Sequence, residues 1–395
     1  METSSFQQVE RRFQADGADA ALECLVQQLL TEKDYRQLFQ ARLLQKRFEL
    51  GLPLIQSSAF ESLPPENRAV FEEAFLRAAR ETGELFLADG DIPGAWPYFR
   101  AIGDLAPVRA AIDKVEQHEN VAAIIEIAYQ EQVHPRKGFE LILSQYGVCR
   151  AISSVFQYPD PEGRKDCIAL LTRTLHADLV QNLKHAIART ESQSPETSSI
   201  TDLIRGRDWL FGENAYYIDT SHVVSVVQYS LELSDNEALG LALQLAEYGS
   251  CLGSMFQRCG NPPLETFQDY RQYLRGVLGI DVEESVAHFR RKIDDCDPLE
   301  VGTSPAQVLV GLLSRLGRHS EAIAVSLKHL HDVDPNQLAC PSVLQLCQLA
   351  GDFNQLREIS SQRGDLLSFT AALLQKKQPS TSHGLGNRSG CSTDL

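Results

Sequence analysis

Apolar side chains recur every three or four residues along almost the whole chain, which is the spacing of one face of an α-helix. The pattern is clearest over 19–30, 33–50 and 66–88, and Gly51 with Pro53 ends the second stretch. No run of alternating β-branched residues calls for a sheet. The pattern therefore predicts an all-α protein of roughly sixteen to twenty helices joined by short loops.

Four prolines mark expected helix starts, because the first turn of a helix is where a missing backbone N–H costs nothing. They are Pro135, Pro161, Pro305 and Pro341. Each precedes a stretch with helical spacing, so we expect each of the four to lie in the first turn of a helix.

Two stretches break the helical pattern and suggest how the chain is divided. Residues 190–202 are polar and rich in hydroxyl groups, and they predict an exposed linker or long loop. Residues 376–395 carry almost no apolar side chains and predict a disordered tail. The expected organisation is a helical array over 1–189, the linker, a second helical array over 203–375, and the tail.

One window has the order of small and aromatic residues that lets two helices pack closely. Small residues would let the helices approach, aromatic rings would fill the space between them, and a proline would end the second helix. In the window 76–107 these residues are Gly83, Phe86, Ala95, Phe99 and Pro107. Their offsets resemble those of a tetratricopeptide repeat, although Ala79 and Thr82 stand where that motif prefers Trp and Leu.

A second window, 303–335, carries part of the same motif, with Gly317 at its turn. The turn recurs at Gly351, which is 34 residues further on and equals the tetratricopeptide period. A third window, 337–369, matches weakly. The resemblance covers about a quarter of the chain, and any amphipathic helical hairpin would share some of it. It implies an α-solenoid of antiparallel helix pairs, with another irregular α-solenoid as the alternative.

Charge and composition narrow the function. The formal net charge is −16, which argues against non-specific binding to nucleic acid or to an anionic membrane surface. The N-terminus has no apolar run like that of a secretory signal, and the longest uncharged stretches are too short to span a bilayer. The nine cysteines include no CxxC pair, so we expect small buried thiols in a reducing cytoplasm and no metal site.

Catalytic motifs are absent from the sequence. It contains no phosphate-binding loop with a lysine, no G-x-S-x-G, no H-E-x-x-H and no dinucleotide fingerprint. We therefore expect no bound cofactor and name no catalytic residue. This favours a non-enzymatic role without deciding the question.

The most unusual stretch is 205–229, where aromatic, arginine and acidic side chains are interleaved. These residue types dominate binding hot spots, but they could equally form an aromatic plug that anchors a loop. Asp219 and His222 could orient an imidazole, or Asp219 could cap a helix. His134, before Pro135, could cap a helix or face a groove. The candidate binding residues are Arg205, Arg207, Trp209, Tyr216, Tyr217, Asp219, His222 and His134.

Two functions remain open at this point. The first is a cytoplasmic helical-repeat scaffold that binds a protein or peptide in a concave groove, where an acidic groove would suit a basic partner. The second is an all-α enzyme or small-molecule binder with a site around Asp219, His222 and the aromatic cluster. The sequence leaves the partner, the oligomeric state and the number of true repeats open.

Overall fold

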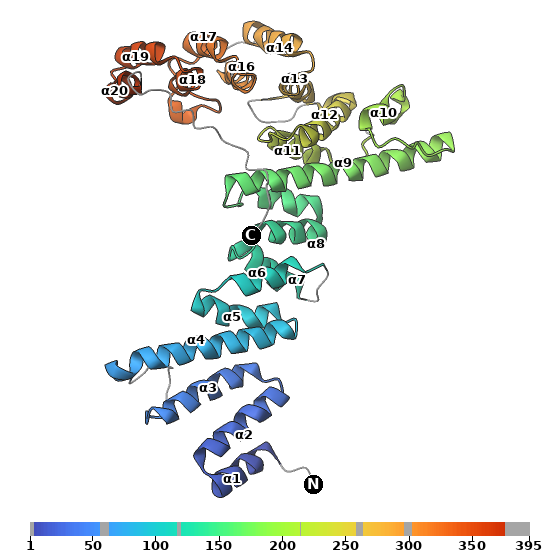
Figure 1. Ribbon diagram of the computed structural model, residues 1–395. Coiled ribbons are helices and arrows are strands. Elements are labelled where there is room, and N and C mark those ends of the chain that lie inside the picture. The colour runs from blue at the N-terminus through green and yellow to red at the C-terminus, as the bar shows by residue number, and fades with distance from the viewer. Residues whose placement is uncertain are drawn as a thin grey trace, which may run out of the picture. The chain divides into compact units, whose positions relative to one another are not determined.

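The prediction of an all-α fold is confirmed. A computed structural model of the chain describes residues 4–55, 63–116, 120–213, 215–257, 264–295 and 302–375. Within these ranges it contains nineteen α-helices and no β-strand (Figure 1). The predicted disordered tail, 376–395, lies outside the described residues.

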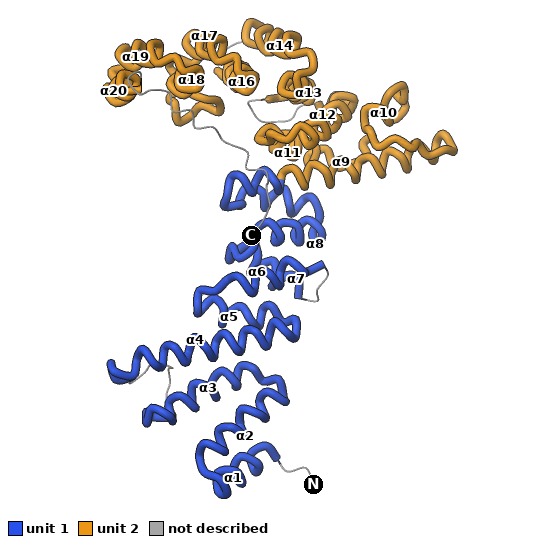
Figure 2. Tube along the Cα trace, viewed as in Figure 1, with its two compact units in different colours: residues 1–167 blue, residues 168–395 orange. Residues whose placement is uncertain are grey.

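The chain divides into two compact units, residues 1–167 and 168–395 (Figure 2). The boundary falls inside the long helix α9 (Pro161–Glu191). Segment 190–202 lies within the second unit, where it joins the end of α9 to the short helix α10 (Ile200–Ile204). The division of the chain at 190–202 into two helical arrays stays a prediction.

In the first unit, helices that follow one another in the sequence pack against each other, from α1 on α2 through to α5 on α6. A single π-helical turn, Glu126–Gln130, continues α7. Two apolar clusters lie between α2, α3, α4 and α5, centred on the buried side chains of Leu38 and Phe71. The helices of this unit are α1 (Ser5–Asp16), α2 (Ala18–Thr31), α3 (Tyr35–Glu49), α4 (Pro65–Ala88), α5 (Ile92–Ile102), α6 (Ala106–Asp113), α7 (Val121–Ile125) and α8 (Pro135–Val155).

The second unit repeats this neighbour-on-neighbour packing, from α11 on α12 through to α19 on α20. Short 3-10 turns begin at Asp208, Ser254 and Pro335. After α10, its helices are α11 (Thr220–Ser230), α12 (Asn236–Cys251), α13 (Phe267–Val277), α14 (Val282–Asp295), α16 (Ser304–Arg315), α17 (His319–His329), α18 (Val343–Ala350), α19 (Phe353–Gln362) and α20 (Leu366–Gln375).

The proline signals predicted three helix starts of four. Pro135 and Pro161 are the first residues of α8 and α9, and Pro305 is the second residue of α16. Pro341 lies before α18, because Ser342 is the N-cap there and forms a capping box with Gln345. The start of α18 is therefore set by the capping side chain of Ser342, and Pro341 lies outside the first turn.

The helix pair α4–α5 is packed as its small and aromatic residues predicted. A Cβ added to Gly83 would lie 2.6 Å from Cε2 of Phe99, so only glycine allows this approach. Ala95 and Phe99 are fully buried. Pro107 was expected to end the second helix, but α5 ends at Ile102, where Gly103 adopts a left-handed conformation, and Pro107 is the second residue of α6.

The turn that recurs after 34 residues in the sequence also recurs in the structure. Gly317 follows α16 with φ 71°, and Gly351 follows α18 with φ 69°. The next helix begins two residues later in both cases, at His319 and at Phe353. The two turns therefore share a left-handed glycine placed two residues before the next helix.

Among the described residues, none of the helices combines the length and the apolar composition needed to cross a bilayer. The same residues hold no group of three or more His, Cys, Asp or Glu side chains arranged to bind a metal ion.

Candidate functional site

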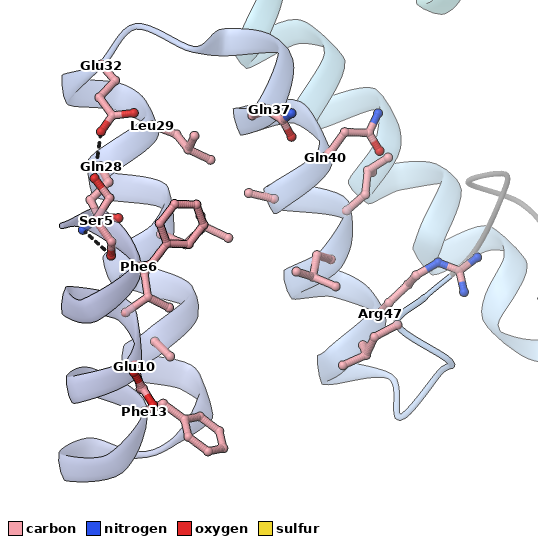
Figure 3. Close-up of a pocket in the computed structure, with 17 residues that line it drawn as sticks. Ser5, Phe6, Glu10, Phe13, Gln28, Leu29, Glu32, Gln37, Gln40 and Arg47 are labelled. Atoms are coloured by element: carbon pink, nitrogen blue, oxygen red, sulfur yellow. Dashed lines mark hydrogen bonds between the residues drawn. The ribbon is translucent and has the colours of Figure 1, made fainter.

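An apolar groove of about 960 Å³ lies in the first unit, at the N-terminal helices (Figure 3). Helices α1, α2 and α3 each present one stripe of residues to it, spaced three or four apart. We call it the α1–α3 groove. Its lining residues are Ser5, Phe6, Val9, Glu10, Phe13, Ala21, Leu25, Gln28, Leu29, Glu32, Gln37, Gln40, Ala41, Leu43, Leu44, Arg47 and Leu54.

Local sequence signals build the three helices around the groove. The side chain of Ser4 caps α1 by accepting a hydrogen bond from the backbone N–H of Gln7. Gly17 ends α1 and begins α2, and its φ of 88° allows the chain to reverse within one residue. The side chain of Asp34 caps α3 through the N–H of Gln37, at 3.1 Å. The caps and the glycine thus set α1 and α3 beside α2.

Polar bonds, rather than the phenylalanines, hold α1 to α2. The side chain of Gln28 donates to Gln8 at 2.8 Å and to the carbonyl of Ser5 at 3.3 Å. The hydroxyl of Ser5 donates to Glu32 at 3.1 Å. No residue of α1 is buried, and Phe6 and Phe13 are 88% and 58% exposed. Phe6 and Phe13 therefore remain largely exposed to solvent.

Three charged side chains line the groove, Glu10, Glu32 and Arg47, and Arg47 is buried. Figure 3 shows Glu32 beside Ser5 at one end and Arg47 on α3 at the other. The guanidinium of Arg47 donates to the carbonyl of Pro53 at 2.9 Å and lies over the ring of Phe71. The middle of the groove is formed mainly by apolar side chains. Such a surface suits an apolar, elongated ligand.

The groove residues of α1 were not among the binding residues predicted from the sequence. Phe6, Val9 and Phe13 carry the signal, since their spacing of three and four residues gives an aromatic stripe on a helix near the N-terminus. Spacing alone does not say that this stripe lacks a packing partner. That fact depends on how α1 lies against α2.

The structure places the predicted binding residues in both units. His134 lies in the first unit and acts as a helix cap. Its Nδ1 accepts from the N–H of Lys137, and its Nε2 lies 2.7 Å from the carboxylate of Asp113. The other seven residues lie in the second unit.

Several of these seven side chains are engaged in local structure. Arg207 binds Glu191 through two hydrogen bonds of 2.7 and 3.0 Å, and these bonds raise its pKa. Arg205 pairs with Asp202 at 3.0 Å. The side chain of Asp219 accepts from the hydroxyl and the N–H of Ser221, which lowers its pKa and makes it the N-cap of α11.

The loop before α11 is tied to α9 and α12. The N–H of Tyr217 donates to the hydroxyl of Tyr248 at 2.8 Å, and Asn182 donates to the carbonyl of Tyr217. Burial raises the pKa of Tyr248 to about 12. Tyr216 meets Phe256 edge to face but stays 57% exposed. The loop is thus anchored from beneath while its outer aromatics face solvent.

Trp209 and His222 complete the predicted set. Trp209, in the 3-10 turn Asp208–Leu210, is 45% exposed and therefore is not part of a buried plug. His222 is half-buried in the first turn of α11. His222 and His134 belong to different units.

Comparison of the chain with protein-family models, with curated proteins and with solved structures found no match.

Proposed function

We propose that this protein is a non-enzymatic helical-repeat scaffold that binds an apolar helical segment of a partner in the α1–α3 groove. The observation that carries the proposal is the exposed aromatic stripe of α1 facing α3 across the groove. An amphipathic helix bound in a groove inserts its own apolar residues at i, i+3 or i+4, and i+7, and these would contact Phe6, Val9 and Phe13.

The arrangement of the helices supports a solenoid with tetratricopeptide-like pairs. In each unit, the helices pack on their neighbours in the sequence, as in repeat proteins, where each repeat contacts the next. The close approach of Gly83 to Phe99 and the two matching turns at Gly317 and Gly351 favour helix pairs of the tetratricopeptide kind. Proteins of this architecture bind partners in grooves formed by successive helices.

The groove is preferred to the site around Asp219 and His222 because several polar side chains near that site are already hydrogen-bonded within the chain. The carboxylate of Asp219 is occupied as a helix cap, and Arg207 is held by Glu191. Phe6 and Phe13, in contrast, contribute little to packing within the chain and present a large apolar area. Large aromatic side chains of this kind supply much of the energy of protein interfaces.

Selection of binding peptides tests the proposal. A library of random helical peptides is selected on the full chain, and the binders are measured by fluorescence anisotropy. We expect peptides with apolar residues at positions i, i+3 or i+4, and i+7. Replacing both exposed rings, Phe6→Asp with Phe13→Asp, should weaken their binding by at least about tenfold, since each buried aromatic anchor contributes more than about 1 kcal/mol.

A matched control separates binding in the groove from non-specific binding to exposed apolar side chains. Leu76→Asp changes an exposed apolar residue of α4 in the same unit, away from the groove. It should leave the binding constant unchanged. Peptides that bind the two-ring variant as tightly as the natural chain, or a selection that yields no binder, would refute the proposal.

A further inference from the structure

Another cavity, of about 460 Å³, lies in the second unit between α9 and the loop that follows it. One stripe of α9 forms one wall, and two serines of the loop form the other. None of the described residues that line it is acidic, in a chain with 53 Asp and Glu residues. The lining residues are His176, Ala177, Val180, Gln181, Lys184, His185, Ala188, Ser194 and Ser198.

Lys184 and His185 supply this cavity with hydrogen-bond donors for an anion. The ammonium of Lys184 donates to the carbonyl of Glu196 at 3.2 Å, and no carboxylate among the described residues forms an ion pair with it. An ammonium has three donors, so Lys184 can bind a further acceptor, and the exposed ring of His185 can donate beside it. His176 differs from both, because burial lowers its pKa and its Nε2 lies 3.1 Å from Oε1 of Gln244.

Ser194 reaches the same cavity from an exposed and irregular stretch of the loop. Residues 194–199 form no helix, strand or turn, and Ser194 is exposed. Pro195 favours an extended backbone at the serine before it. Phosphoryl transfer needs a hydroxyl in line with the γ-phosphate of ATP, and a serine in such a stretch can enter a kinase site. The chain has one other Ser-Pro pair, but Ser304 is half-buried and is the first residue of α16.

The loop is anchored more firmly at its ends than in its middle. At its start Glu191 binds Arg207 through two hydrogen bonds, and at its end the N–H of Ile200 donates to Gln244 at 2.8 Å. Between these ends, the bond from Lys184 to the carbonyl of Glu196 joins the loop to α9. An added charge in the middle of the loop would therefore change its attachment most.

We infer that Ser194 is a site of phosphorylation by a proline-directed protein kinase, and that Lys184 and His185 then hold the phosphate in the cavity. A phosphoserine carries a charge of about −1.5 to −2 at pH 7 and three acceptor oxygens. Charge-assisted hydrogen bonds from Lys184 and His185 fix the middle of the loop against α9. The site lies in the second unit and does not depend on the function proposed for the α1–α3 groove.

The modification is an ordinary phosphoryl transfer with ATP as the donor. The hydroxyl oxygen of Ser194 forms a bond to the γ-phosphorus of ATP. The bond from that phosphorus to the oxygen bridging the β- and γ-phosphates breaks, and ADP leaves with the electron pair. The hydroxyl proton passes to the catalytic base of the kinase.

Labelling of the full chain tests the modification. The chain is incubated with ATP and a proline-directed serine kinase, and the modified residues are mapped by mass spectrometry. We expect phosphate on Ser194 in preference to Ser304, and no phosphate at this loop in Ser194→Ala. Ser192→Ala, a matched change of an exposed serine outside the cavity, should be labelled like the natural chain. Absence of label on Ser194, or equal labelling of Ser304, overturns the inference.

Proteolysis of the loop tests whether the cavity holds the phosphate. Full chain with phosphoserine at position 194 is compared with unmodified chain for cleavage after Glu196 by a glutamyl endopeptidase. The phosphate should slow this cleavage by about threefold to tenfold, and Lys184→Gln should remove most of that protection. Arg189→Gln removes a charge from an exposed residue of α9 outside the cavity and should leave the protection unchanged. Circular dichroism confirms that each variant is folded.

Phosphorus NMR of the same proteins gives a second measure of the contact. A neighbouring cation favours the dianion, so the pKa of the phosphate should be lower by about 0.5 or more in the natural chain than in Lys184→Gln. Equal pKa values, or protection from cleavage that survives Lys184→Gln, would show that Lys184 does not hold the phosphate. Millimolar inorganic phosphate should not protect the unmodified chain. If it protects as well as the phosphoserine does, the cavity binds a free anion and the inference is wrong.

Discussion

The α4–α5 pair and the α1–α3 groove both contain aromatic residues at helical spacing. In the pair the aromatic ring is buried in a packed interface, and in the groove the rings are exposed. In the pair, Gly83 admits the ring of Phe99 until it is fully buried. In the groove, Phe6 and Phe13 are spaced like core residues but lie exposed, because glutamine and serine side chains hold α1 to α2 instead. Aromatic residues at helical spacing therefore mark either a core or a binding surface, and only their neighbours tell which.

The largest expected contrast is in stability. Phe99→Ala should lower the free energy of unfolding by about 3–5 kcal/mol, since it leaves a cavity in a packed interface. Phe13→Ala should change it by less than about 0.5 kcal/mol, as is usual for exposed positions. Urea unfolding followed by circular dichroism measures both. Equal losses would mean that the groove is a packed core.

A buried charge cluster in the second unit extends the comparison to polar groups. The carboxylate of Asp269 is buried and accepts hydrogen bonds from His288 at 2.9 Å and from Lys292 at 2.5 Å. It also forms the capping box of α13 with Thr266. Burial alone would raise the pKa of Asp269, but the hydrogen bonds from His288 and Lys292 and the charge of Lys292 lower it.

Asp269→Asn should therefore destabilise the fold by about 1.5–3 kcal/mol at neutral pH, the range for hydrogen bonds to charged groups. Because the folded-state pKa is lowered, the stabilisation is present above the unfolded value of about 3.9 and is lost as the pH falls towards the folded one. Urea midpoints between pH 7 and pH 3 should fall more steeply for the natural chain than for the variant. Parallel curves would show that Asp269 does not carry this dependence.

Glycine substitutions give a smaller and more local comparison. Gly83→Ala should cost about 1–3 kcal/mol, because the new Cβ meets the ring of Phe99. Gly240→Ala, within α12, places its Cβ in open space and should stabilise the helix by about 0.5–1 kcal/mol. Thermal unfolding of the two variants shows whether each substitution lowers or raises the melting temperature. A neutral Gly83→Ala would mean that α4 and α5 can separate at little cost.

The candidate site was predicted less well than the helices. Trp209 and Tyr216 were named from composition, and both are exposed, so they remain available to a partner. Arg207 was named for the same reason, and Asp219 for its spacing from His222; they are engaged with Glu191 and Ser221. Composition identifies residue types that bind well, but it does not show which of them are already bound within the chain.

The sequence by itself determined that this protein is helical and where many helices begin, and it predicted that small and aromatic residues, Gly83 and Phe99 among them, pack between two helices. These features depend on local periodicity, caps and small-to-large spacing, which neighbouring residues carry in full. Tertiary structure alone decided that Phe6 and Phe13 are uncovered. Exposure depends on what the rest of the chain leaves unpacked, and no local pattern records it.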